Sequence, residues 1–371
     1  MKQHLYPQLI LDTLRSVRYP ATGESIVTSG MVNDDIRING KEVSFSISFP
    51  RVNDPFAKSV IRAAESTLEA MIGEDIEVKG RISATYPEHI VEEELPVLPN
   101  VKNILAISSG KGGVGKSTIT ANLAVSLSLL GYKVGLLDAD IFGPSVPKMF
   151  HCEDARPVLA DVEGQELIDP IERYGVKLLS IGFFVDPANP IVWRGAMASN
   201  ALNQLITQGN WGELDFLLLD LPPGTSDIHL TLVQKLGITG AIIVTTPQEV
   251  ALADARKGVN MFRDPKIQVP ILGIVENMSW FTPSELPENK YYIFGRDGGR
   301  KLALEMDTML LAQIPLVQSV RESGDDGTPI ALKEESLLSH YFRTLAQNVV
   351  EQTQQRNTNL PPTEPVGVNP H

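Results

Sequence analysis

A glycine-rich segment, residues 110–118, has the residue types and spacing of a phosphate-binding loop. It follows an apolar run at 104–108 and precedes a helical stretch at 119–130. Glycines let backbone N–H groups curl around phosphate oxygens at a helix N-terminus, where the helix dipole also favours anions. The residues expected to hold a nucleotide are Gly110, Lys111, Gly112, Gly113, Val114, Gly115, Lys116, Ser117 and Thr118.

Three side chains of this loop have separate expected roles. Lys116 should reach the β- and γ-phosphates, Ser117 should ligate Mg²⁺, and Thr118 is placed to hydrogen-bond the α-phosphate. We therefore predict ATP and Mg²⁺ as cofactors and ATP hydrolysis as the activity. A glycine-rich turn with an incidental lysine is the alternative, which the strand-then-helix context disfavours.

Carboxylates end two apolar runs farther along the chain. Asp138 and Asp140 follow the run at 134–138, and Asp220 ends the run at 216–220. Ligands of doubly wound sheets bind at the carboxyl ends of the strands. Asp140 is placed to orient the attacking water, Asp220 to hold Mg²⁺ through water, and Asp138 to lie beside the metal. Capping of the next helix is the competing role, and it weighs more for Asp138 than for Asp140.

The elements that must position these side chains alternate from residue 103 onward. Short apolar runs without polar interruption suit strands covered on both faces. The runs are residues 104–108, 134–138, 216–220, 241–245 and 271–275. Amphipathic helical segments separate them, so we predict an α/β domain with a doubly wound, mostly parallel sheet over residues 103–350.

A smaller α+β domain is expected over residues 1–85. Two alternating segments meet at Asn39-Gly40, the signal of a type I′ hairpin. Asp54-Pro55 should open a helix that Gly73 ends, and residues 76–83 should form a third strand. Prolines and glutamates predict a linker at 86–102, and the polar composition of residues 351–371 predicts a disordered tail.

Composition limits the function. The chain has 371 residues, with 32 Lys and Arg against 45 Asp and Glu, so its net charge of −13 argues against nucleic acid as a partner. No apolar stretch approaches the ~18 residues of a spanning helix, so we expect no membrane partner and a cytoplasmic protein. The single cysteine, Cys152, excludes an intrachain disulfide and any Cys-x-x-Cys metal site.

Lys111 gives the loop a resemblance to the deviant Walker A box of the nitrogenase-iron-protein and cell-division-positioning ATPases. An ordinary phosphate-binding loop does not need this lysine. In that superfamily it crosses a dimer interface to the partner's nucleotide, which implies a homodimer in which Lys111, Lys116 and Asp140 act in catalysis. The resemblance also implies that Asn277 reads the adenine edge, with a turn-forming asparagine as the alternative. Arg194 could bind either phosphate or the partner subunit, and the sequence does not decide between these roles.

Several segments together resemble the Mrp/ApbC branch, the ATP-binding iron–sulfur cluster carriers. These segments are residues 140–145, 193–195, 220–225, 246–248 and 276–279. Residues 1–85 resemble the small SufT/PaaD-like domain that precedes the ATPase in many bacterial members. The resemblance implies a cluster carrier whose partners are apo iron–sulfur proteins or assembly factors.

The chain departs from this branch at the metal-binding loop. Family members carry Cys-Pro-x-Cys shortly after the Glu-Asn-Met-Ser segment, whereas residues 280–287 here read Trp-Phe-Thr-Pro-Ser-Glu-Leu-Pro. A bridging [4Fe–4S] cluster takes four cysteines, and a dimer of this chain offers only two copies of Cys152. The iron–sulfur ligands are therefore unknown, and Cys152 is predicted to be a buried or inert thiol.

The sequence is compatible with three functions. The favoured one is an ATPase of iron–sulfur cluster assembly, which carries a cluster by unusual ligation or helps to deliver one held elsewhere. The second is a spatial-organising ATPase on membrane or DNA, which the scarcity of basic residues after 351 disfavours. The third is a nucleotide-switched adaptor without a cluster of its own.

Overall fold

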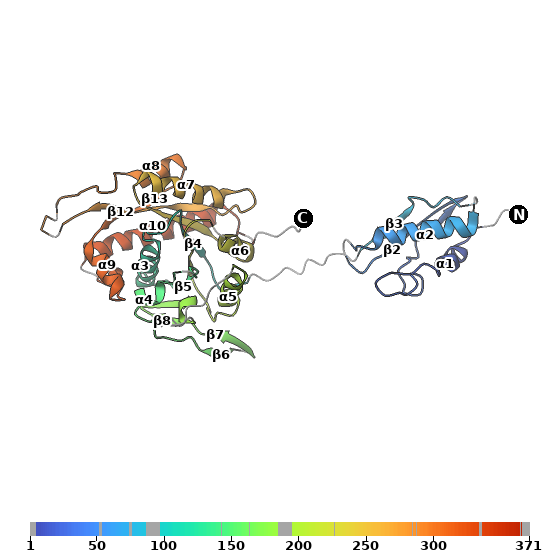
Figure 1. The fold of residues 1–371 in the computed structure, drawn as a ribbon, viewed down its shortest axis with the longest axis horizontal. Helices are drawn as coiled ribbons and strands as arrows, with labels where there is room; N and C mark the ends of the chain where they lie inside the picture. The colour runs from blue at the N-terminus through green and yellow to red at the C-terminus, as the bar shows by residue number, and fades with distance from the viewer. Residues whose placement is uncertain are drawn as a thin grey trace. The chain divides into compact units, whose positions relative to one another are not determined.

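The chain forms two units in the computed structural model, Met1–Glu94 and Leu95–His371 (Figure 1). The residues described are 5–51, 54–73, 76–86, 97–141, 143–162, 164–184, 195–225, 227–283, 285–286, 288–333, 336–363 and 365.

The first unit is a small α+β domain built on a three-stranded sheet. Its elements are α1 Pro7–Leu14, β1 Arg37–Asn39, β2 Glu42–Ser48, α2 Ala57–Ile72 and β3 Ile82–Thr85. β2 pairs with β1 antiparallel and with β3 parallel, so α2 is the crossover between two parallel strands. Val60, Ala64 and Leu68 of α2 are buried at four-residue intervals, as the apolar face of a helix requires.

The hairpin of this unit turns one residue later than predicted. Asn39 pairs with Glu42, so the two loop residues are Gly40 and Lys41. Gly40 has a φ of 64°, and a glycine at the first loop position is typical of a type II′ turn. The type I′ prediction is therefore wrong.

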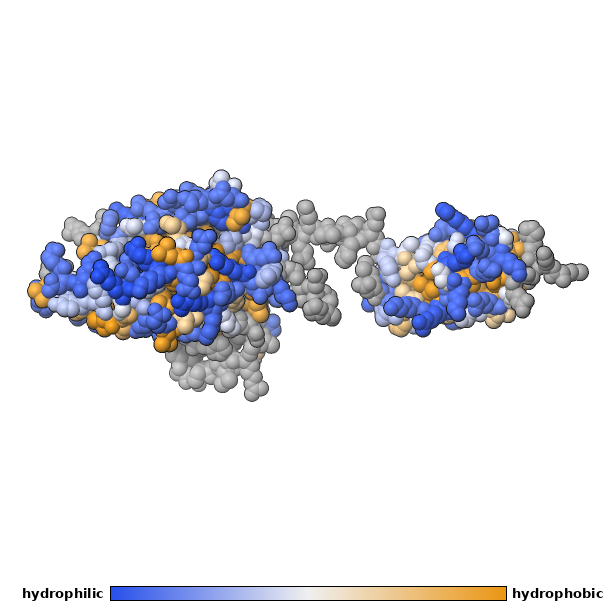
Figure 2. All heavy atoms as spheres, turned by 90° about the horizontal axis from the view of Figure 1, so that it is seen from above, coloured by the Kyte–Doolittle hydropathy of each residue, from blue (hydrophilic) through white to orange (hydrophobic). Residues whose placement is uncertain are grey.

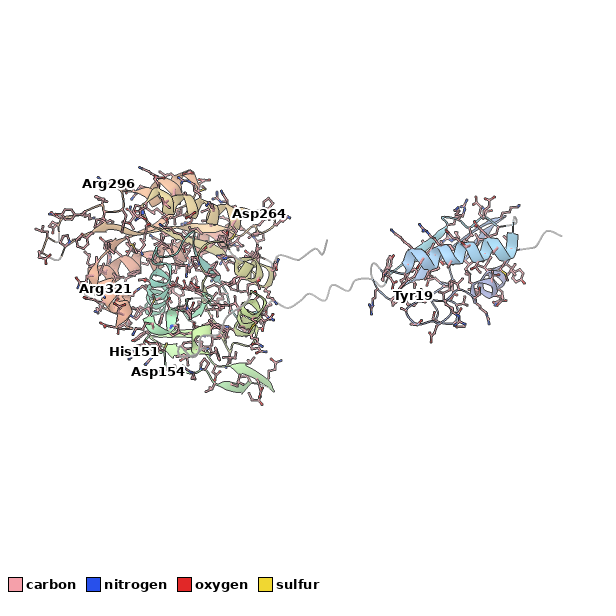
Figure 3. The ribbon with its side chains drawn as sticks, viewed as in Figure 1. Tyr19, His151, Asp154, Asp264, Arg296 and Arg321 are labelled. Carbon is pink, nitrogen blue, oxygen red and sulfur yellow. The ribbon has the colours of Figure 1, made fainter. Side chains whose placement is uncertain are left out.

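The start of α2 also differs from the prediction. The helix begins at Ala57, and Asp54 caps the turn before it, accepting a 2.8 Å hydrogen bond from the N–H of Phe56. The second carboxylate oxygen of Asp54 accepts from the hydroxyl of Tyr19, which Figure 3 marks in this unit. Asp54 thus serves the tertiary fold as well as the helix start.

The second unit is built on one sheet of eight strands in the order β13-β12-β11-β4-β10-β5-β9-β8. The strands are β4 Ile104–Ser109, β5 Val134–Asp138, β8 Ile171–Arg173, β9 Val176–Ser180, β10 Phe216–Asp220, β11 Gly240–Thr245, β12 Ile271–Phe281 and β13 Leu310–Leu316. Neighbours are parallel except β8 with β9 at one edge. The predicted doubly wound, mostly parallel sheet is confirmed.

Helices cover both faces of this sheet (Figure 1). They are α3 Lys116–Leu129, α4 Val146–Met149, α5 Gly195–Thr207, α6 Asp227–Lys235, α7 Glu249–Arg263, α8 Gly298–Glu305, α9 Gln318–Asp325 and α10 Leu337–Asn359, with 3-10 turns η2 Ile181–Phe183 and η3 Ile330–Leu332. A short antiparallel pair, β6 Leu159–Val162 with β7 Gln165–Ile168, stands outside the sheet.

Two buried apolar clusters lie on the two faces of the sheet. One includes residues of α3 and α10, and the other includes residues of α5, α6 and α7. Successive strand residues alternate between them, so that Leu136 belongs to the first cluster and Leu137 to the second. Because both faces are covered, the strands read as continuous apolar runs in the sequence.

The predicted linker runs to residue 102, but its last residues belong to the second unit. The N–H of Lys102 donates to the carbonyl of Leu214, and the N–H of Leu214 donates to the carbonyl of Asn100. Residues 100–102 are therefore tied to the second unit by backbone hydrogen bonds. Within the rest of the predicted linker, Tyr86 and residues 97–99 are described, and residues 87–96 lie outside the described residues.

The prediction of a disordered tail from residue 351 is wrong for residues 351–359, which form the last turns of α10. Val349 and Thr353 are buried, and the Thr353 hydroxyl donates to the carbonyl of Val349 at 2.7 Å. The polar composition of residues 351–359 gives no sign that the helix continues through them. A helix extends at low free-energy cost once its earlier turns are packed, so the domain does not end at residue 350.

Among the described residues, no helix combines the length and apolar character needed to cross a bilayer. α10 is the longest helix described, and its buried residues include Leu345 and Val349. Figure 2 shows hydrophilic residues over much of each unit, interspersed with small apolar patches.

Candidate functional site

The glycine-rich loop joins β4 to α3 at the carboxyl edge of the sheet. Gly113 and Gly115 have φ values of 81° and 83°, which residues with a side chain rarely adopt. Gly110 is needed for another reason, because a Cβ there would lie 2.2 Å from the carbonyl carbon of Asp254 in α7. Backbone conformation and one close helix contact therefore fix the path of the loop.

The loop forms one wall of a cavity of about 230 Å³. The lining residues are Ser109, Gly112, Gly113, Val114, Gly115, Lys116, Ser117, Thr118, Asp140, Ser145, Met149 and Pro223. Asp140 follows β5 and Pro223 follows β10, and β10 lies between β4 and β5 in the sheet. The structure thus brings Asp140 to the loop, because carboxyl ends of parallel strands meet at one edge.

Lys116 and Asp220 form a buried ion pair beside this cavity. Their Nζ and Oδ1 atoms are 2.8 Å apart, and the two side chains are 6% and 0% exposed. The Asp220 carboxylate also accepts from the Ser117 hydroxyl at 2.6 Å and from the Thr120 hydroxyl at 2.7 Å. Three side chains from the first turns of α3 therefore bind the same carboxylate.

Asp138 is buried next to Asp220 in the sheet register, but it serves the backbone. Its carboxylate accepts from the Ser180 hydroxyl at 3.0 Å and from the N–H groups of Asp140 and Val146 at 3.1 and 3.3 Å. Burial, and then the charge of Asp220, raise the pKa of Asp138 above its ordinary value. Its contact with the N–H of Val146 anchors the segment that leads into α4, but the N-cap of that helix is Ser145, and the place of Asp138 beside the metal stays a prediction.

Asn277 does not lie in a loop after a strand, because β12 continues past it to Phe281. Its side-chain nitrogen donates to the carbonyl of Val114 at 2.9 Å, and a Cβ on Gly115 would lie 2.3 Å from the same nitrogen. Asn277 therefore braces the phosphate-binding loop from a strand two positions away in the sheet. The adenine-reading role that the resemblance implies stays a prediction, with the turn-forming asparagine as its alternative.

Lys111 and Arg194 are placed differently from the other predicted residues. Lys111 is half-buried and is not part of the cavity lining. Within the part of the chain that the structure describes, its ammonium group has no hydrogen bond or ion pair. Arg194 lies outside the described residues.

Cys152 is buried, as predicted, and lies after α4. Its Sγ donates to the carbonyl of Pro147 at 3.4 Å. Burial raises the pKa of the Cys152 thiol to about 11, so the group is protonated at neutral pH. No cluster of three or more His, Cys, Asp or Glu side chains suited to a metal ion occurs among the described residues.

Backbone pairing and aromatic contacts hold the segment from Trp280 to Tyr291. Phe281 and Tyr291 exchange backbone hydrogen bonds of 2.8 and 2.9 Å, which closes the chain between them into a projecting loop. The Lys290 ammonium lies 4.1 Å from the centre of the Trp280 ring, and Trp280 packs edge-on against Tyr341 of α10. Figure 3 marks Arg296 near the end of this segment. Ser284 is outside the described residues, and Glu285 is exposed.

Two residues at the site were not predicted. Thr120 binds Asp220, and it follows Lys116 by four residues, which places both on one face of a helix. That spacing is a signal available in the sequence. Ser180, which binds Asp138, ends β9, and only the order of strands in the sheet brings it to that carboxylate.

Family profiles match both units. Residues 100–350 match the ParA-type profile of the NUBPL iron-transfer P-loop NTPases, and residues 7–79 match the profile of iron–sulfur cluster assembly proteins. An iron-sulfur cluster carrier protein of Synechocystis sp. is 41% identical over 342 residues, which cover 92% of this chain and 96% of that protein. The Escherichia coli iron-sulfur cluster carrier protein is 50% identical over 258 residues, which cover 69% of this chain and 68% of that protein.

Solved structures agree with these matches. A nucleotide-binding protein of Archaeoglobus fulgidus in complex with ADP has a TM-score of 0.56 at 35% identity, covering 66% of this chain and 93% of that chain. The Pyrococcus furiosus cell division ATPase MinD has a TM-score of 0.50 at 25% identity, covering 67% of this chain and 99% of that chain. Together with the geometry of the loop, these findings confirm the resemblance found in the sequence: the chain belongs to the NUBPL family of iron-transfer P-loop NTPases, the iron–sulfur cluster carriers.

Proposed function

We propose that this P-loop ATPase of iron–sulfur cluster assembly moves clusters whose iron is ligated by the thiolates of another protein. The proposal rests on one contrast. The ATPase constellation of Lys116, Ser117 and Asp220 is complete, whereas the only cysteine of the chain is buried. The cluster is then cargo that the protein helps to transfer, and apo iron–sulfur proteins or assembly factors are its partners.

Nucleotide binding would rearrange the buried pair. A phosphate group in the cavity competes with Asp220 for the Lys116 ammonium, because both are anions that need the same donor. Ser117 and Asp220 offer the oxygen ligands that Mg²⁺ prefers, the latter through water, and bound Mg²⁺ would neutralise phosphate charge. Asp140, which lines the same cavity, is proposed to orient the attacking water.

Lys111 supports the proposal of a homodimer. Its ammonium has no partner among the described residues and lies outside the lining of its own cavity. A lysine that serves the nucleotide of a second subunit must be uncommitted in this way. The site of one chain then lacks a cation that its partner supplies, as an arginine finger in trans does.

The residues present do not fit a protein-bound cluster. Iron–sulfur clusters take thiolate ligands, and Cys152 is a buried, protonated thiol bound to a backbone carbonyl. The exposed carboxylate of Glu285, in the segment that replaces the cysteine motif, is a harder ligand than thiolate. In the proposed function this chain therefore ligates no iron itself.

Anaerobic reconstitution tests this function. The full-length protein is incubated with iron and sulfide in thiol-free buffer, desalted, and assayed for iron, sulfide and ATP turnover. We expect ATP turnover with far less than one stable cluster per dimer, and the same turnover in Cys152→Ser.

Two results would contradict the proposal. A stoichiometric cluster that survives desalting and is lost in Cys152→Ser would make this thiol a ligand. Failure of the wild-type protein, in the presence of ATP, to speed transfer of a cluster from a thiolate scaffold to an apo iron–sulfur protein would remove the transfer role itself.

A further inference from the structure

Glu276 of β12 is a buried carboxylate with no part in the proposed ATP chemistry. Its side chain is 0% exposed and does not line the nucleotide cavity. A carboxylate loses its hydration on burial, so such a group needs hydrogen bonds or charges that compensate the loss. Glu276 directly precedes Asn277, which braces the phosphate-binding loop, so the contacts that hold Glu276 also constrain Asn277.

Two neutral donors compensate this charge within the described part of the chain. The Glu276 carboxylate accepts from the N–H of Gly299, in the first turn of α8, and from the side-chain amide of Gln313 in β13 at 2.8 Å. The N-terminal end of α8 also carries a partial positive charge, which favours an anion. A Cβ on Gly299 would lie 2.7 Å from the Cβ of Glu276, so α8 begins in direct contact with β12.

Gln313 extends this network to Asp297, the N-cap residue of α8. Its amide nitrogen donates to the Asp297 carboxylate at 3.1 Å as well as to Glu276, and Gln313 lies opposite Glu276 in the pairing of β12 with β13. Three elements therefore meet at one buried carboxylate: β12, β13 and the start of α8. Because the projecting loop lies between β12 and α8 in the sequence, Glu276 joins the two ends of the segment that contains this loop.

The backbone of β12 leaves regular geometry immediately after Asn277. Met278 has a φ of 54°, which residues with a side chain rarely adopt, and the pairing with β13 shifts register between Asn277 and Phe281. The Ser279 hydroxyl donates to the carbonyl of Glu276 at 2.8 Å across this irregularity. A strained residue of this kind persists only where the surrounding structure holds it. On its N-terminal side, the contacts of Glu276 provide that hold.

Asn277 has little room to move relative to the phosphate-binding loop. Neighbouring strand residues point to opposite faces of a sheet, so Glu276 faces α8 while Asn277 faces the loop. The Asn277 amide donates to the carbonyl of Val114 at 2.9 Å, and a Cβ on Gly115 would lie 2.3 Å from the same nitrogen. A strand displaced from α8 would therefore lose this hydrogen bond or press on the loop.

We propose that Glu276 is a positioning residue of the nucleotide site. By holding β12 against β13 and α8, its carboxylate places the Asn277 amide at the carbonyl of Val114 and so fixes the shape of the phosphate-binding loop. Glu276 lies outside the nucleotide cavity, so its effect passes through Asn277. The proposal concerns nucleotide binding alone and does not depend on the role in cluster transfer.

A double-mutant cycle tests this route, with ATP affinity measured by fluorescence titration of the full-length protein. We expect Glu276→Ala to weaken ATP binding about tenfold, as loss of the buried hydrogen bond that it positions would. Glu276→Gln, which keeps an acceptor for the N–H of Gly299, should restore affinity to within about threefold of wild type. Adding Glu276→Ala to Asn277→Ala should cause no further loss, because the two residues act in series.

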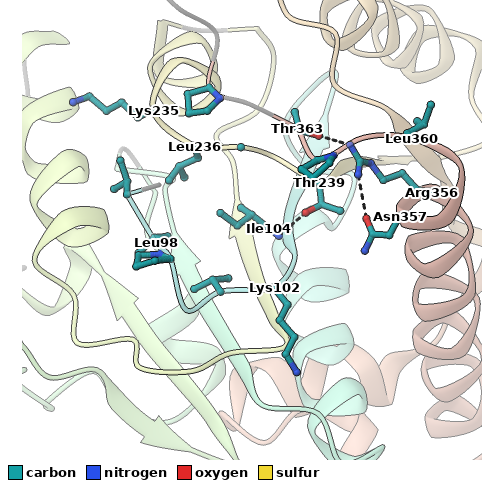
Figure 4. A pocket seen from close by; sticks show the side chains of 16 residues that line it. Leu98, Lys102, Ile104, Lys235, Leu236, Thr239, Arg356, Asn357, Leu360 and Thr363 are labelled. Carbon is teal, nitrogen blue, oxygen red and sulfur yellow. Dashed lines mark hydrogen bonds between the residues drawn. The ribbon is translucent and has the colours of Figure 1, made fainter. Parts of the chain in front are cut away.

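Thr239→Val is the matched control for loss of a buried hydrogen bond elsewhere in the sheet. The Thr239 hydroxyl accepts from the N–H of Ile104 at 3.0 Å, beside a cavity at the opposite end of β4 from the phosphate-binding loop (Figure 4). This variant should lower the free energy of unfolding but leave ATP affinity at the wild-type value. If Glu276 merely stabilised the fold, Glu276→Ala would behave in the same way.

Gln313→Met replaces Glu276→Ala in the cycle if the latter does not fold. It removes one donor to the carboxylate and leaves Glu276 in place, so we expect ATP affinity to fall about threefold, and only where Asn277 is present. Wild-type affinity in folded Glu276→Ala and in Gln313→Met would overturn the proposal, as would losses that add fully in the double variants. A loss of affinity in Thr239→Val as large as in Glu276→Ala would overturn it too, because affinity would then follow stability alone.

Discussion

Asp220 is the residue that holds the side chains at the start of α3 together beside the phosphate-binding loop. It accepts from Lys116, Ser117 and Thr120, and it is fully buried. A buried carboxylate without a cation is costly, since its charge loses solvation and gains no compensating partner. Lys116 therefore stabilises Asp220 in the fold, in addition to the phosphate binding that we propose for it.

Lys116→Met separates these two tasks. We expect ATP turnover to be abolished, because the phosphates lose their cation, and the free energy of unfolding of the second unit to fall by about 3–5 kcal/mol, because Asp220 is left unpaired. Urea unfolding and an ATPase assay measure both. Adding Asp220→Asn should recover stability but not turnover; a stability equal to wild type in Lys116→Met would show that the ion pair does not form.

Among the elements, β12 connects the phosphate-binding loop to the projecting loop beyond Phe281. Glu276 accepts from the N–H of Gly299 at the start of α8, Asn277 holds the carbonyl of Val114, and Trp280 packs against Tyr341. All three positions lie within β12, whose pairing with β13 shifts register between Asn277 and Phe281. A shift of the phosphate-binding loop would therefore act directly on the strand that leads to the projecting loop.

Asn277→Ala tests whether this residue positions the loop or reads the base. Loss of a buried hydrogen bond to the loop costs about 1–3 kcal/mol, so we expect affinity for ATP and for GTP to fall by a similar factor of about tenfold. Nucleotide titration followed by fluorescence gives both affinities, with Asn289→Ala on the projecting loop as control. If only ATP affinity falls, Asn277 reads adenine and the bracing role is secondary.

At the scale of the whole molecule, the proposed dimer assigns Lys111 and Lys116 to different nucleotides. In the proposed dimer Lys116, which is paired with Asp220, would serve the nucleotide of its own chain, and the ammonium of Lys111 would be available to a second copy. This division of labour predicts that the two lysines differ in what their removal does to affinity and to assembly.

Lys111→Ala should leave nucleotide affinity of the monomer within about twofold of wild type, but weaken ATP-dependent dimerisation and slow hydrolysis, since the missing cation acts in trans. Sedimentation with a non-hydrolysable ATP analogue measures assembly, and Lys133→Ala, an exposed lysine paired with Glu213, is the control. Equal assembly and turnover in Lys111→Ala and wild type would contradict the trans role.

The sequence by itself determined the features that depend on neighbours along the chain. The glycine pattern at 110–118 predicted the phosphate-binding loop, and the apolar runs at 134–138 and 216–220 predicted two strands to the residue. Local dihedral limits and burial on both faces leave such segments little choice. The absence of a cysteine pair is also a property of the sequence alone.

Only the tertiary structure decided which distant groups meet. Asp138 binds Ser180, Asn277 binds Val114, and Arg356 lies beside Thr363 at a cavity built from three separated segments. The same applies to residues 351–359, whose polar composition predicted disorder but which continue a helix anchored by the core. Strand order and helix packing set these contacts, and no spacing within one segment encodes them.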